Sequence, residues 1–490
     1  MPNLDLKTEL ETAVAGQLVR SRILIISYLF PPAGGIGVQR ALSLARYLPN
    51  SGFAVHVLQA SNAAAPVFDP ALCQRVPGSV QVHGSFTPEA PFWLRHTVWN
   101  WLSRKKKDSP KPAQASAPSA SASATSTSSG SSASPAAPSA SAPSKSKTGG
   151  LKSLATRMIR RILSPEPEVL WYPFALRAAS RVVRRYGIDT VMVTAPPFSA
   201  FLVGNALKRR FPHLKYVADF RDEWLSFYIK DFEYQSGEHA RRRATEIERA
   251  TVESADLVVA VAATSLKEIR GRYPELPGSK FRCISNGFDP EAFSGFDPRP
   301  NTGKNLIVTH VGTAYKTSSP QFYLDAVDAL QDEVRNQIET RFIGRITDAE
   351  RQQFENRKSN TRLLGFMPQT EALRSMEDTD CLLVTMTNDI SLPGKLYEYM
   401  AARKPVIALS PKGGEVDRFI QETGAGWCID YRDQEGIREL LTKLCRQKAE
   451  TGSCEKRIAD DETIQRFARP RLVSDYAEAM VRLRSLADAG

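Results

Sequence analysis

Short, uninterrupted runs of apolar residues recur along the chain, separated by longer segments in which apolar residues return every three or four positions. Runs without polar alternation are typical of strands buried on both faces of a parallel sheet, and the periodic segments predict amphipathic helices that cover it. Strands are predicted at residues 23–26, 53–58, 189–194, from 215 to about 222, 256–261, 281–287, 306–312, 340–345, 361–366, 381–385 and 406–409. The alternation of strand and helix predicts an α/β fold.

A change in composition divides this pattern into two series. Residues 290–304 are rich in proline, glycine and asparagine, which predicts a linker between domains. The first series occupies residues 20–295 and the second occupies residues 304–468, with a C-terminal helix at about 470–486 as a candidate to pack back on the first. The implied architecture is two doubly wound, Rossmann-like domains that face each other across a cleft.

Residues 108–150 interrupt the first series. They consist almost wholly of Ser, Ala, Pro, Thr, Gly and Lys, so they cannot bury a core and are predicted to be a disordered insertion. The flanking residues 92–107 mix aromatic side chains with a basic end, and residues 151–163 predict an amphipathic helix with basic residues off its apolar face. Two interpretations stay open: the flanks lie in an anionic membrane interface, or they pack as ordinary domain helices.

A glycine-rich loop follows the first strand. Gly34, Gly35 and Gly37 come after two prolines and directly precede a helix, which is a layout that lets backbone approach a ligand closely. The spacing is not that of the dinucleotide fingerprint G-x-G-x-x-G. The loop is therefore either a ligand-binding loop or a tight turn between strand and helix.

Three charged residues follow the strand that starts at residue 215. Asp219, Arg221 and Asp222 lie at its carboxyl end, where open α/β sheets bind ligands. Two carboxylates beside an arginine are suited to orient a sugar or an acceptor hydroxyl. A structural cluster of ion pairs at a strand end is the alternative.

The segment at residues 391–409 predicts a loop, a short helix over about 393–403, a turn and a buried strand. Leu396, Tyr399 and Met400 share one helix face, whereas Lys395 and Glu398 share another. The helix N-terminus is suited to hold a diphosphate, and Glu398 is suited to accept hydrogen bonds from ribose hydroxyls. An ordinary helix with a solvated Lys395–Glu398 ion pair is the other interpretation.

The composition, 42% hydrophobic and 24% charged, is that of a globular protein, and its apolar runs are too short to span a bilayer. Residues 1–20 lack the apolar region of a secretory signal. The six cysteines include no C-x-x-C pair, which argues against a zinc site or a disulfide framework and fits a reducing cytoplasm. Asp378 and Asp380 form a D-x-D pattern between a helix and a strand, and we expect them to cap that junction.

The net charge of +12 favours an anionic partner, such as a nucleotide, a nucleic acid or an acidic membrane surface. Charge alone does not choose among them. The sequence contains no recognised nucleic-acid-binding motif and no aromatic and basic sheet face, so no nucleic-acid partner is expected.

Several of these segments together resemble glycosyltransferase family 4, whose members have the GT-B fold of two facing Rossmann-like domains. The resemblance is carried, in chain order, by residues 28–35 with Arg40, 195–197, 218–222, 285–289, 310–313 and 393–407. The last segment has the Pro-x-Lys-Leu-x-Glu-Tyr form of one subgroup. The resemblance implies transfer of a sugar, with retention of anomeric configuration, from a nucleotide-sugar donor to a polysaccharide or lipid-linked glycan. It implies no bound metal, and we expect no other cofactor. Our first hypothesis is a cytoplasmic enzyme, in which the basic amphipathic segments make peripheral contact with the inner face of the plasma membrane.

The resemblance also implies roles for individual residues. The donor diphosphate would lie over the helix that starts at Pro393, and Glu398 would bind the ribose. The implied donor-binding residues are Gly34, Gly35, Gly312, Lys316, Gly394, Lys395, Leu396 and Glu398, and the implied catalytic residues are Asp219, Arg221 and Asp222.

Two positions depart from the family pattern. The second glutamate of many members is Ile390 here, and the arginine that often follows the glycine matching Gly312 is replaced by a run that ends in Lys316. Two other functions therefore stay open. One is a nucleotide-sugar epimerase of the same fold, which would act without an acceptor. The other is a binding protein with a degenerate site, for which Ile390 is the main argument.

Overall fold

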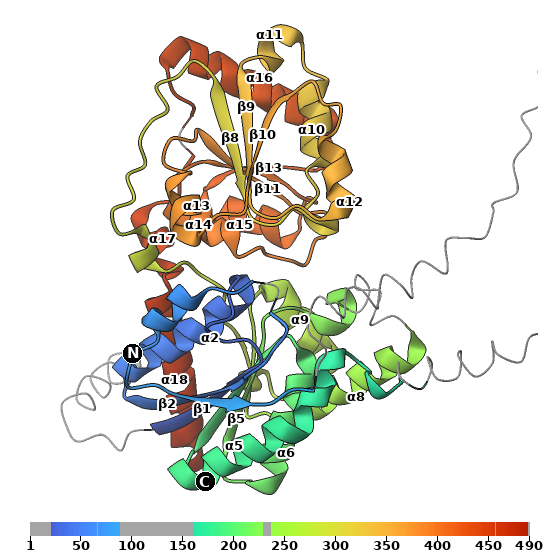
Figure 1. Cartoon of the computed structure of the whole chain (residues 1–490), viewed down its shortest axis with the longest axis vertical. Helices are drawn as coiled ribbons and strands as arrows, with labels where there is room; N and C mark the ends of the chain where they lie inside the picture. The colour runs from blue at the N-terminus through green and yellow to red at the C-terminus, as the bar shows by residue number, and fades with distance from the viewer. Residues whose placement is uncertain are drawn as a thin grey trace, which may run out of the picture. The chain divides into compact units, whose positions relative to one another are not determined.

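The structure, a computed structural model, describes residues 21–65, 67–88, 158, 161–228, 237–455 and 457–488. Residues 90–164 form a unit separate from the rest of the chain, and only residues 158 and 161–164 of that unit are described. The predicted insertion at 108–150 and the segment at 92–107 lie outside the described residues. The remaining described residues form two α/β domains (Figure 1).

Within the described residues, the first domain has seven parallel strands in the order β3-β2-β1-β4-β5-β6-β7. They are β1 (Ser21–Ser27), β2 (Phe53–Ala60), β3 (Gln81–Ser85), β4 (Thr190–Ala195), β5 (Lys215–Phe220), β6 (Leu257–Ala260) and β7 (Phe281–Cys283). One face is covered by α5 (Tyr172–Tyr186), α6 (Phe201–Arg210), α8 (Glu238–Ser254) and α9 (Ala263–Arg272), and the other by α2 (Ile36–Tyr47) and α18 (Arg469–Asp488). Both faces are buried, which explains the uninterrupted apolar runs.

The second domain has a six-stranded parallel sheet in the order β10-β9-β8-β11-β12-β13. Its strands are β8 (Leu306–Val311), β9 (Ile338–Ile343), β10 (Asn360–Gly365), β11 (Cys381–Thr385), β12 (Val406–Leu409) and β13 (Gly426–Ile429). One face is covered by α10 (Gln321–Asp328) and α16 (Gln434–Thr451), and the other by α13 (Gln369–Arg374), α14 (Lys395–Ala401) and α15 (Glu415–Thr423). Shorter helices are α11 (Asp332–Arg335), α12 (Asp348–Arg351) and α17 (Asp461–Arg466).

The strand order reverses once in each sheet, between β1 and β4 and between β8 and β11. Ligands of open α/β sheets bind outside the carboxyl ends of the strands at this point of reversal. The two doubly wound parallel sheets confirm the predicted α/β class with Rossmann-like domains. They also direct attention to the residues that follow β1 and β8.

Two strands were not predicted from the sequence. Strand β3 (Gln81–Ser85) lies at a sheet edge and is largely exposed, so its sequence is mostly polar. Strand β13 (Gly426–Ile429) is a short edge strand that begins with glycine. Strand β3 is mostly polar, and β13 begins within a glycine-rich segment, so neither gives the uninterrupted apolar run that marks the central strands.

The last helix of the chain, α18 (Arg469–Asp488), packs against α2 of the first domain. It follows the entire second domain in sequence, yet its apolar side chains belong to the core beneath β1, β4 and β5. Its buried core residues are Leu472, Val473, Tyr476, Ala477 and Met480. The first domain is therefore completed by a helix that follows the second domain in sequence.

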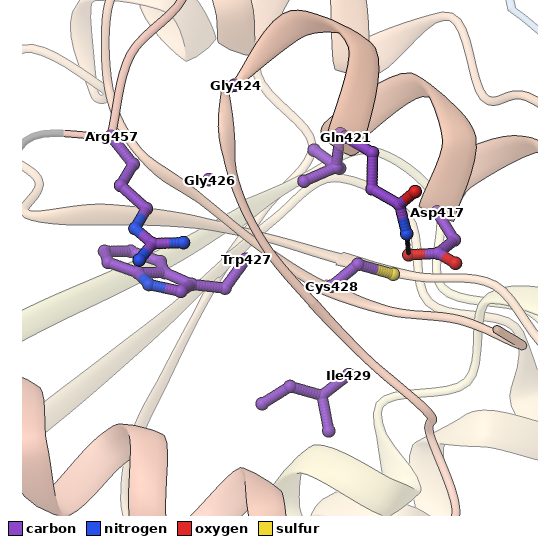
Figure 2. Close-up of a pocket in the computed structure, with 9 residues that line it drawn as sticks. Asp417, Gln421, Gly424, Gly426, Trp427, Cys428, Ile429 and Arg457 are labelled. Atoms are coloured by element: carbon purple, nitrogen blue, oxygen red, sulfur yellow. Dashed lines mark hydrogen bonds between the residues drawn. The ribbon is translucent and has the colours of Figure 1, made fainter.

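A pocket of about 400 Å³ lies beside β13 in the second domain. Figure 2 shows Gln421 directed toward Asp417, to which it donates a hydrogen bond, and Arg457 over the ring of Trp427. None of the predicted donor-binding residues lines this pocket. Its volume therefore does not mark the site that the sequence predicts.

Candidate functional site

The carboxyl end of β8 and the start of α14 lie together in the second domain. The Tyr399 hydroxyl accepts a hydrogen bond from the Val311 backbone N–H at 2.7 Å and donates one to the Val311 carbonyl at 3.1 Å. Tyr399 therefore fixes α14 against the end of β8. Lys395, one turn earlier on α14, also lies against the end of β8, beside His310 and Gly312.

The Lys395 amine lies beside β8. Its Nζ atom is 3.1 Å from Nε2 of His310, and a Cβ placed on Gly312 would lie 3.3 Å from Nζ. Gly312 has a φ of 130°, a conformation that side chains disfavour, so its backbone angle favours glycine, and a side chain there would lie against the Lys395 amine. Burial lowers the pKa of Lys395 to about 7, and the neighbouring Glu398 opposes this shift in part.

Glu398 is half-buried one turn further along α14. Gln369 donates a hydrogen bond to its Oε1 at 2.9 Å, while Oε2 accepts none from the residues that the structure describes. Burial raises the pKa of Glu398, opposed by Arg469, by the bond from Gln369 and by Lys395. No ion pair joins Lys395 to Glu398 within the described chain, where Lys395 contacts His310 and Glu398 contacts Gln369, so the structure does not show the solvated pair of the alternative interpretation.

The other predicted donor-binding residues differ in what they offer a ligand. Leu396 is completely buried in the core of the second domain, as its helical periodicity indicated, so its side chain has no surface for a donor. Lys316 is exposed and begins a short 3₁₀ turn. Gly394 precedes α14 with ordinary helical angles. The role of each in donor binding stays a prediction.

The glycine-rich loop of the first domain contains two different glycines. A Cβ on Gly34 would lie 2.9 Å from Val67, so Gly34 is required by packing within the loop. Gly35 precedes α2 with a φ of 88°, and a Cβ there would meet nothing within 4 Å. Gly35 thus has the open backbone that a ligand-binding loop needs, whereas Gly34 has a structural reason to be glycine.

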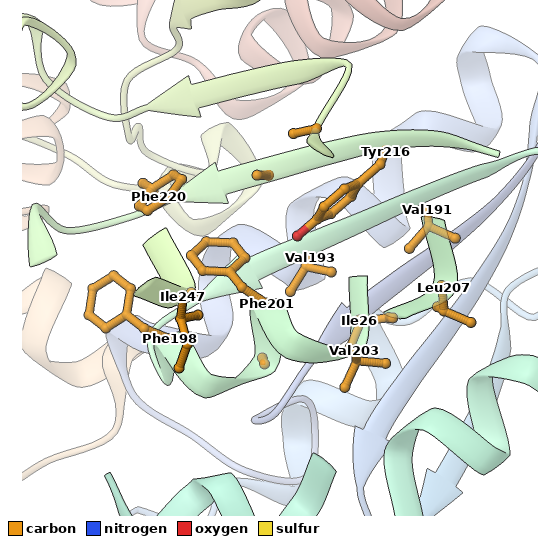
Figure 3. Close-up of a cluster of buried hydrophobic side chains, with 14 of the residues drawn as sticks. Ile26, Val191, Val193, Phe198, Phe201, Val203, Leu207, Tyr216, Phe220 and Ile247 are labelled. Carbon is orange, nitrogen blue, oxygen red and sulfur yellow. The ribbon is translucent and has the colours of Figure 1, made fainter. Parts of the chain in front are cut away.

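Asp219 lies on the face of β5 that α2 and α18 cover, opposite the aromatic core. Figure 3 shows Tyr216 and Phe220 of the same strand directed into the core with Phe201. Asp219 is completely buried. Its carboxylate accepts hydrogen bonds from Arg40 at 2.9 Å, from Thr194 at 2.7 Å and from Tyr476 at 2.6 Å.

These partners determine the charge of Asp219. Burial alone would raise the pKa of its carboxyl, but Arg40 together with the hydrogen bonds from Tyr476 and Thr194 outweighs burial and lowers it. Arg40 also donates to the carbonyls of Ile284 and Ser285. The ion pair therefore joins α2, β5, α18 and the segment after β7. This arrangement is the structural cluster of ion pairs that was the alternative interpretation. The carboxylate of Asp219 has no exposed atom with which it could contact a substrate.

Arg221 and Asp222, which follow β5, differ in their hydrogen bonds. The Arg221 guanidinium donates hydrogen bonds to the carbonyls of Gly37 and Pro196, so it joins the glycine-rich loop to the end of β4. Asp222 is half-buried, and its carboxylate accepts no hydrogen bond from the described residues. Burial raises its pKa to about 6, opposed in part by Arg221. Asp222 is thus the one carboxylate of the predicted trio that is able to meet a ligand.

The D-x-D pattern has a structural role. Asp380 accepts hydrogen bonds from the Ile307 backbone N–H at 2.9 Å and from Asn301 at 2.7 Å, and Lys448 pairs with it at 3.0 Å. Asp380 thus joins the starts of β8 and β11, as expected for a capping residue. Across the part of the chain that the structure describes, no group of three or more His, Cys, Asp or Glu side chains is arranged to hold a metal ion.

Sequence reasoning did not single out several residues that contact the predicted ones, among them His310, Gln369 and Tyr476. His310 was noted only as part of a family segment, Gln369 had no signal, and Tyr476 was not singled out in the predicted C-terminal helix. Each pairs with a residue at least 29 positions away in the chain, namely Lys395, Glu398 and Asp219. Local spacing carries no information on such pairs.

Two protein-family models match the chain. The model described as Glycosyltransferase Family 4 matches residues 134–292, and the model described as Glycosyl transferases group 1 matches residues 305–447. A curated relative, the probable glycosyltransferase WbjE of Pseudomonas aeruginosa, is 33% identical over 94 residues, which are 19% of this chain and 24% of the relative. The chain therefore aligns with about a quarter of that relative's length.

Two solved structures illustrate the fold that this chain shares. HepE of Anabaena, in complex with UDP and glucose, is 16% identical with a TM-score of 0.57, over 94% of this chain and 100% of that chain. WaaG, a glycosyltransferase involved in lipopolysaccharide biosynthesis, is 13% identical with a TM-score of 0.51, over 93% and 98%. At these identities the likeness shows the fold, and it confirms the predicted GT-B architecture.

Proposed function

The chain belongs to glycosyltransferase family 4, and we propose that it transfers a sugar from a nucleotide-sugar donor to a polysaccharide or lipid-linked glycan with retention of anomeric configuration. The observation that carries this proposal is the arrangement at the end of β8. The Lys395 amine lies over the Gly312 backbone, and one turn away Glu398 presents a carboxylate oxygen that accepts no hydrogen bond from the described part of the chain. The UDP and glucose bound to HepE, which has the same fold, support a nucleotide-sugar donor.

Each residue has a chemical task in the proposed reaction. The departing diphosphate needs a cation, which Lys395 supplies. The ribose needs acceptors, which Glu398 supplies. Retention requires the acceptor hydroxyl to approach on the face that the diphosphate leaves, and Asp222 is suited to accept a hydrogen bond from that hydroxyl. We expect no metal or other cofactor, because Lys395 neutralises part of the developing charge.

A thermal-shift titration with UDP, GDP, ADP and their common sugars tests the donor site. We expect a saturable shift with one nucleotide, and at least tenfold weaker binding to Glu398→Ala, because a hydrogen bond to a charged group contributes about 1.5–3 kcal/mol. Glu371→Ala is the matched control, since Glu371 is an exposed glutamate on the neighbouring helix α13.

The outcomes separate the candidate functions. No shift with any nucleotide, or equal affinity in wild type and Glu398→Ala, would contradict the proposed donor site. Conversion of a nucleotide sugar without an acceptor would instead favour the epimerase. Binding without turnover on any acceptor would favour the binding protein.

We further propose a peripheral site of action at an anionic membrane on the cytoplasmic side. In the described part of the amphipathic segment, Met158 and Ile162 lie four residues apart and are 65% and 61% exposed, and Arg161 is exposed beside them. Exposed apolar side chains flanked by basic ones suit a membrane interface. Among the described residues, none of the helices has the length and apolar content needed to cross a bilayer.

Sedimentation with vesicles that contain phosphatidylglycerol tests the membrane contact. We expect binding that weakens as salt rises and is lost in the Arg160→Glu, Arg161→Glu double variant, because each basic residue near an anionic surface contributes about 1 kcal/mol. The double variant Arg242→Glu, Arg243→Glu on the exposed face of α8 is the control. Absent or salt-insensitive binding of the wild type would refute the membrane contact.

A further inference from the structure

A completely buried histidine lies directly behind Lys395. We propose that His310 is a positioning residue of the donor site: its neutral imidazole accepts a hydrogen bond from the Lys395 amine and holds that amine over Gly312, where the donor diphosphate would bind. This role rests on the proposed function of the same site. His310 itself would touch neither donor nor acceptor.

The hydrogen bonds of His310 fix its tautomer. Nδ1 lies 3.0 Å from the Leu383 carbonyl of β11, which accepts only, so Nδ1 carries the hydrogen. Nε2 of the neutral ring then presents a lone pair, and it lies 3.1 Å from Nζ of Lys395. The Phe342 ring packs against the imidazole with centroids 5.3 Å apart. One strand thus orients the ring, and the ring orients the amine.

The surroundings keep His310 neutral. It is 1% exposed, and burial together with the charge of Lys395 lowers its pKa well below the ordinary value. The lone pair on Nε2 is therefore present throughout the physiological pH range. A protonated ring would instead repel the amine, so the neutral state is the one that allows the contact.

Apart from His310, few described side chains could position the Lys395 amine. Glu398 on the same helix is the only charged side chain that stabilises its ammonium form among the described residues, and Gln369 and Arg469 face that glutamate from α13 and α18. With a pKa of about 7, the amine is only partly charged in the free protein. An anionic diphosphate favours the charged form, so nucleotide binding should take up a proton.

Two substitutions of His310 distinguish the roles of its two ring nitrogens. His310→Asn keeps a short amide that can donate to the Leu383 carbonyl but does not reach Lys395. His310→Gln is longer and places an amide oxygen near the position of Nε2. The control is His56→Phe, since His56 is a buried histidine in the other domain. Far-UV circular dichroism and Tm establish that each variant is folded, and His310→Leu replaces the asparagine variant where that one does not fold.

The first measurement needs no nucleotide. Acetic anhydride acylates the neutral amine of lysine, and peptide mass spectrometry across pH 5–10 gives the midpoint at which Lys395 becomes reactive. Loss of the acceptor for the ammonium N–H should shift this midpoint by at least half a pH unit below wild type in His310→Asn. His310→Gln and His56→Phe should keep the wild-type midpoint. The same midpoint in folded His310→Asn as in wild type would overturn the proposed role.

The second measurement is calorimetric titration with UDP, GDP and ADP in two buffers of different ionisation enthalpy. For whichever nucleotide binds, we expect proton uptake at pH 7.5 and at least tenfold weaker binding to His310→Asn, with affinity within threefold of wild type in His310→Gln. Equal affinity in wild type and His310→Asn would overturn the positioning role. No binding to wild type would overturn the proposed function, and the labelling result would still decide whether His310 holds Lys395.

Discussion

Replacing Asp219 with alanine is expected to lower the free energy of unfolding of the first domain by about 3–5 kcal/mol, because Arg40 would stay buried without its counterion. Asp219 is 0% exposed and Arg40 is 9% exposed, so water does not compensate for the lost carboxylate. Tyr476 and Thr194 would also lose their acceptor. Urea denaturation followed by the fluorescence of Trp171 and Trp224, both buried in this domain, measures the loss.

Two further variants show how much of the expected loss comes from the buried ion pair. Asp219→Asn keeps hydrogen-bonding oxygen but removes the charge, so an intermediate loss would assign the remainder to the ion pair. Glu253→Ala removes the exposed pair with Arg249 and should cost no more than about 0.5 kcal/mol. If Asp219→Ala were as stable as Glu253→Ala but inactive, Asp219 would act on a substrate and the structural role would be wrong.

The second prediction is a bell-shaped dependence of kcat/KM on pH, with a maximum between the pKa values of Asp222, about 6, and Lys395, about 7. Asp222 must be ionised to accept a hydrogen bond from the acceptor, so activity falls as pH drops below about 6. Lys395 must be protonated to bind the diphosphate, so activity falls as pH rises above about 7. Each limb should approach a tenfold change per pH unit, since kcat/KM reports the free enzyme.

Two variants identify the residue that causes each limb of the pH profile. Asp222→Asn should remove the acidic limb, and Lys395→Met should remove the alkaline limb while lowering kcat/KM about 100-fold, the scale of one lost charge-stabilising contact. Lys316→Met is the matched control, because Lys316 is the other lysine predicted to contact the diphosphate. Loss of the alkaline limb in Lys316→Met, with Lys395→Met unchanged, would identify Lys316 as the essential cation instead.

The sequence predicted what local spacing determines. The central strands are apolar on both faces, so their pattern located them, while the edge strands β3 and β13 were missed. The helical spacing of Leu396, Tyr399 and Met400 correctly indicated a buried face. That same burial removes the Leu396 side chain from the donor contacts that the family resemblance implied.

The partners of the charged residues could not be predicted, because they lie far away in the sequence. Asp219, Arg221 and Asp222 are close in sequence, but only Asp219 lies within β5, where alternate positions point to opposite faces of the sheet. Asp219 therefore faces the layer of α2 and α18, which is supplied by Arg40 and Tyr476, 179 and 257 residues away. The pairing of Lys395 with His310, 85 residues apart, was equally invisible in the local pattern.

The packing of α18 on the first domain has a consequence for biosynthesis. All the strands of the first sheet have been translated once residue 283 is added, but α18 begins only at residue 469. At about 5–20 residues per second, the ribosome needs about 10–40 s to make the intervening chain. During that time the second domain is able to fold as a unit, while α2 and the sheet beneath it still expose the apolar surface that Tyr476 and its neighbours later cover. The nascent first domain therefore exposes this apolar surface until α18 has been translated.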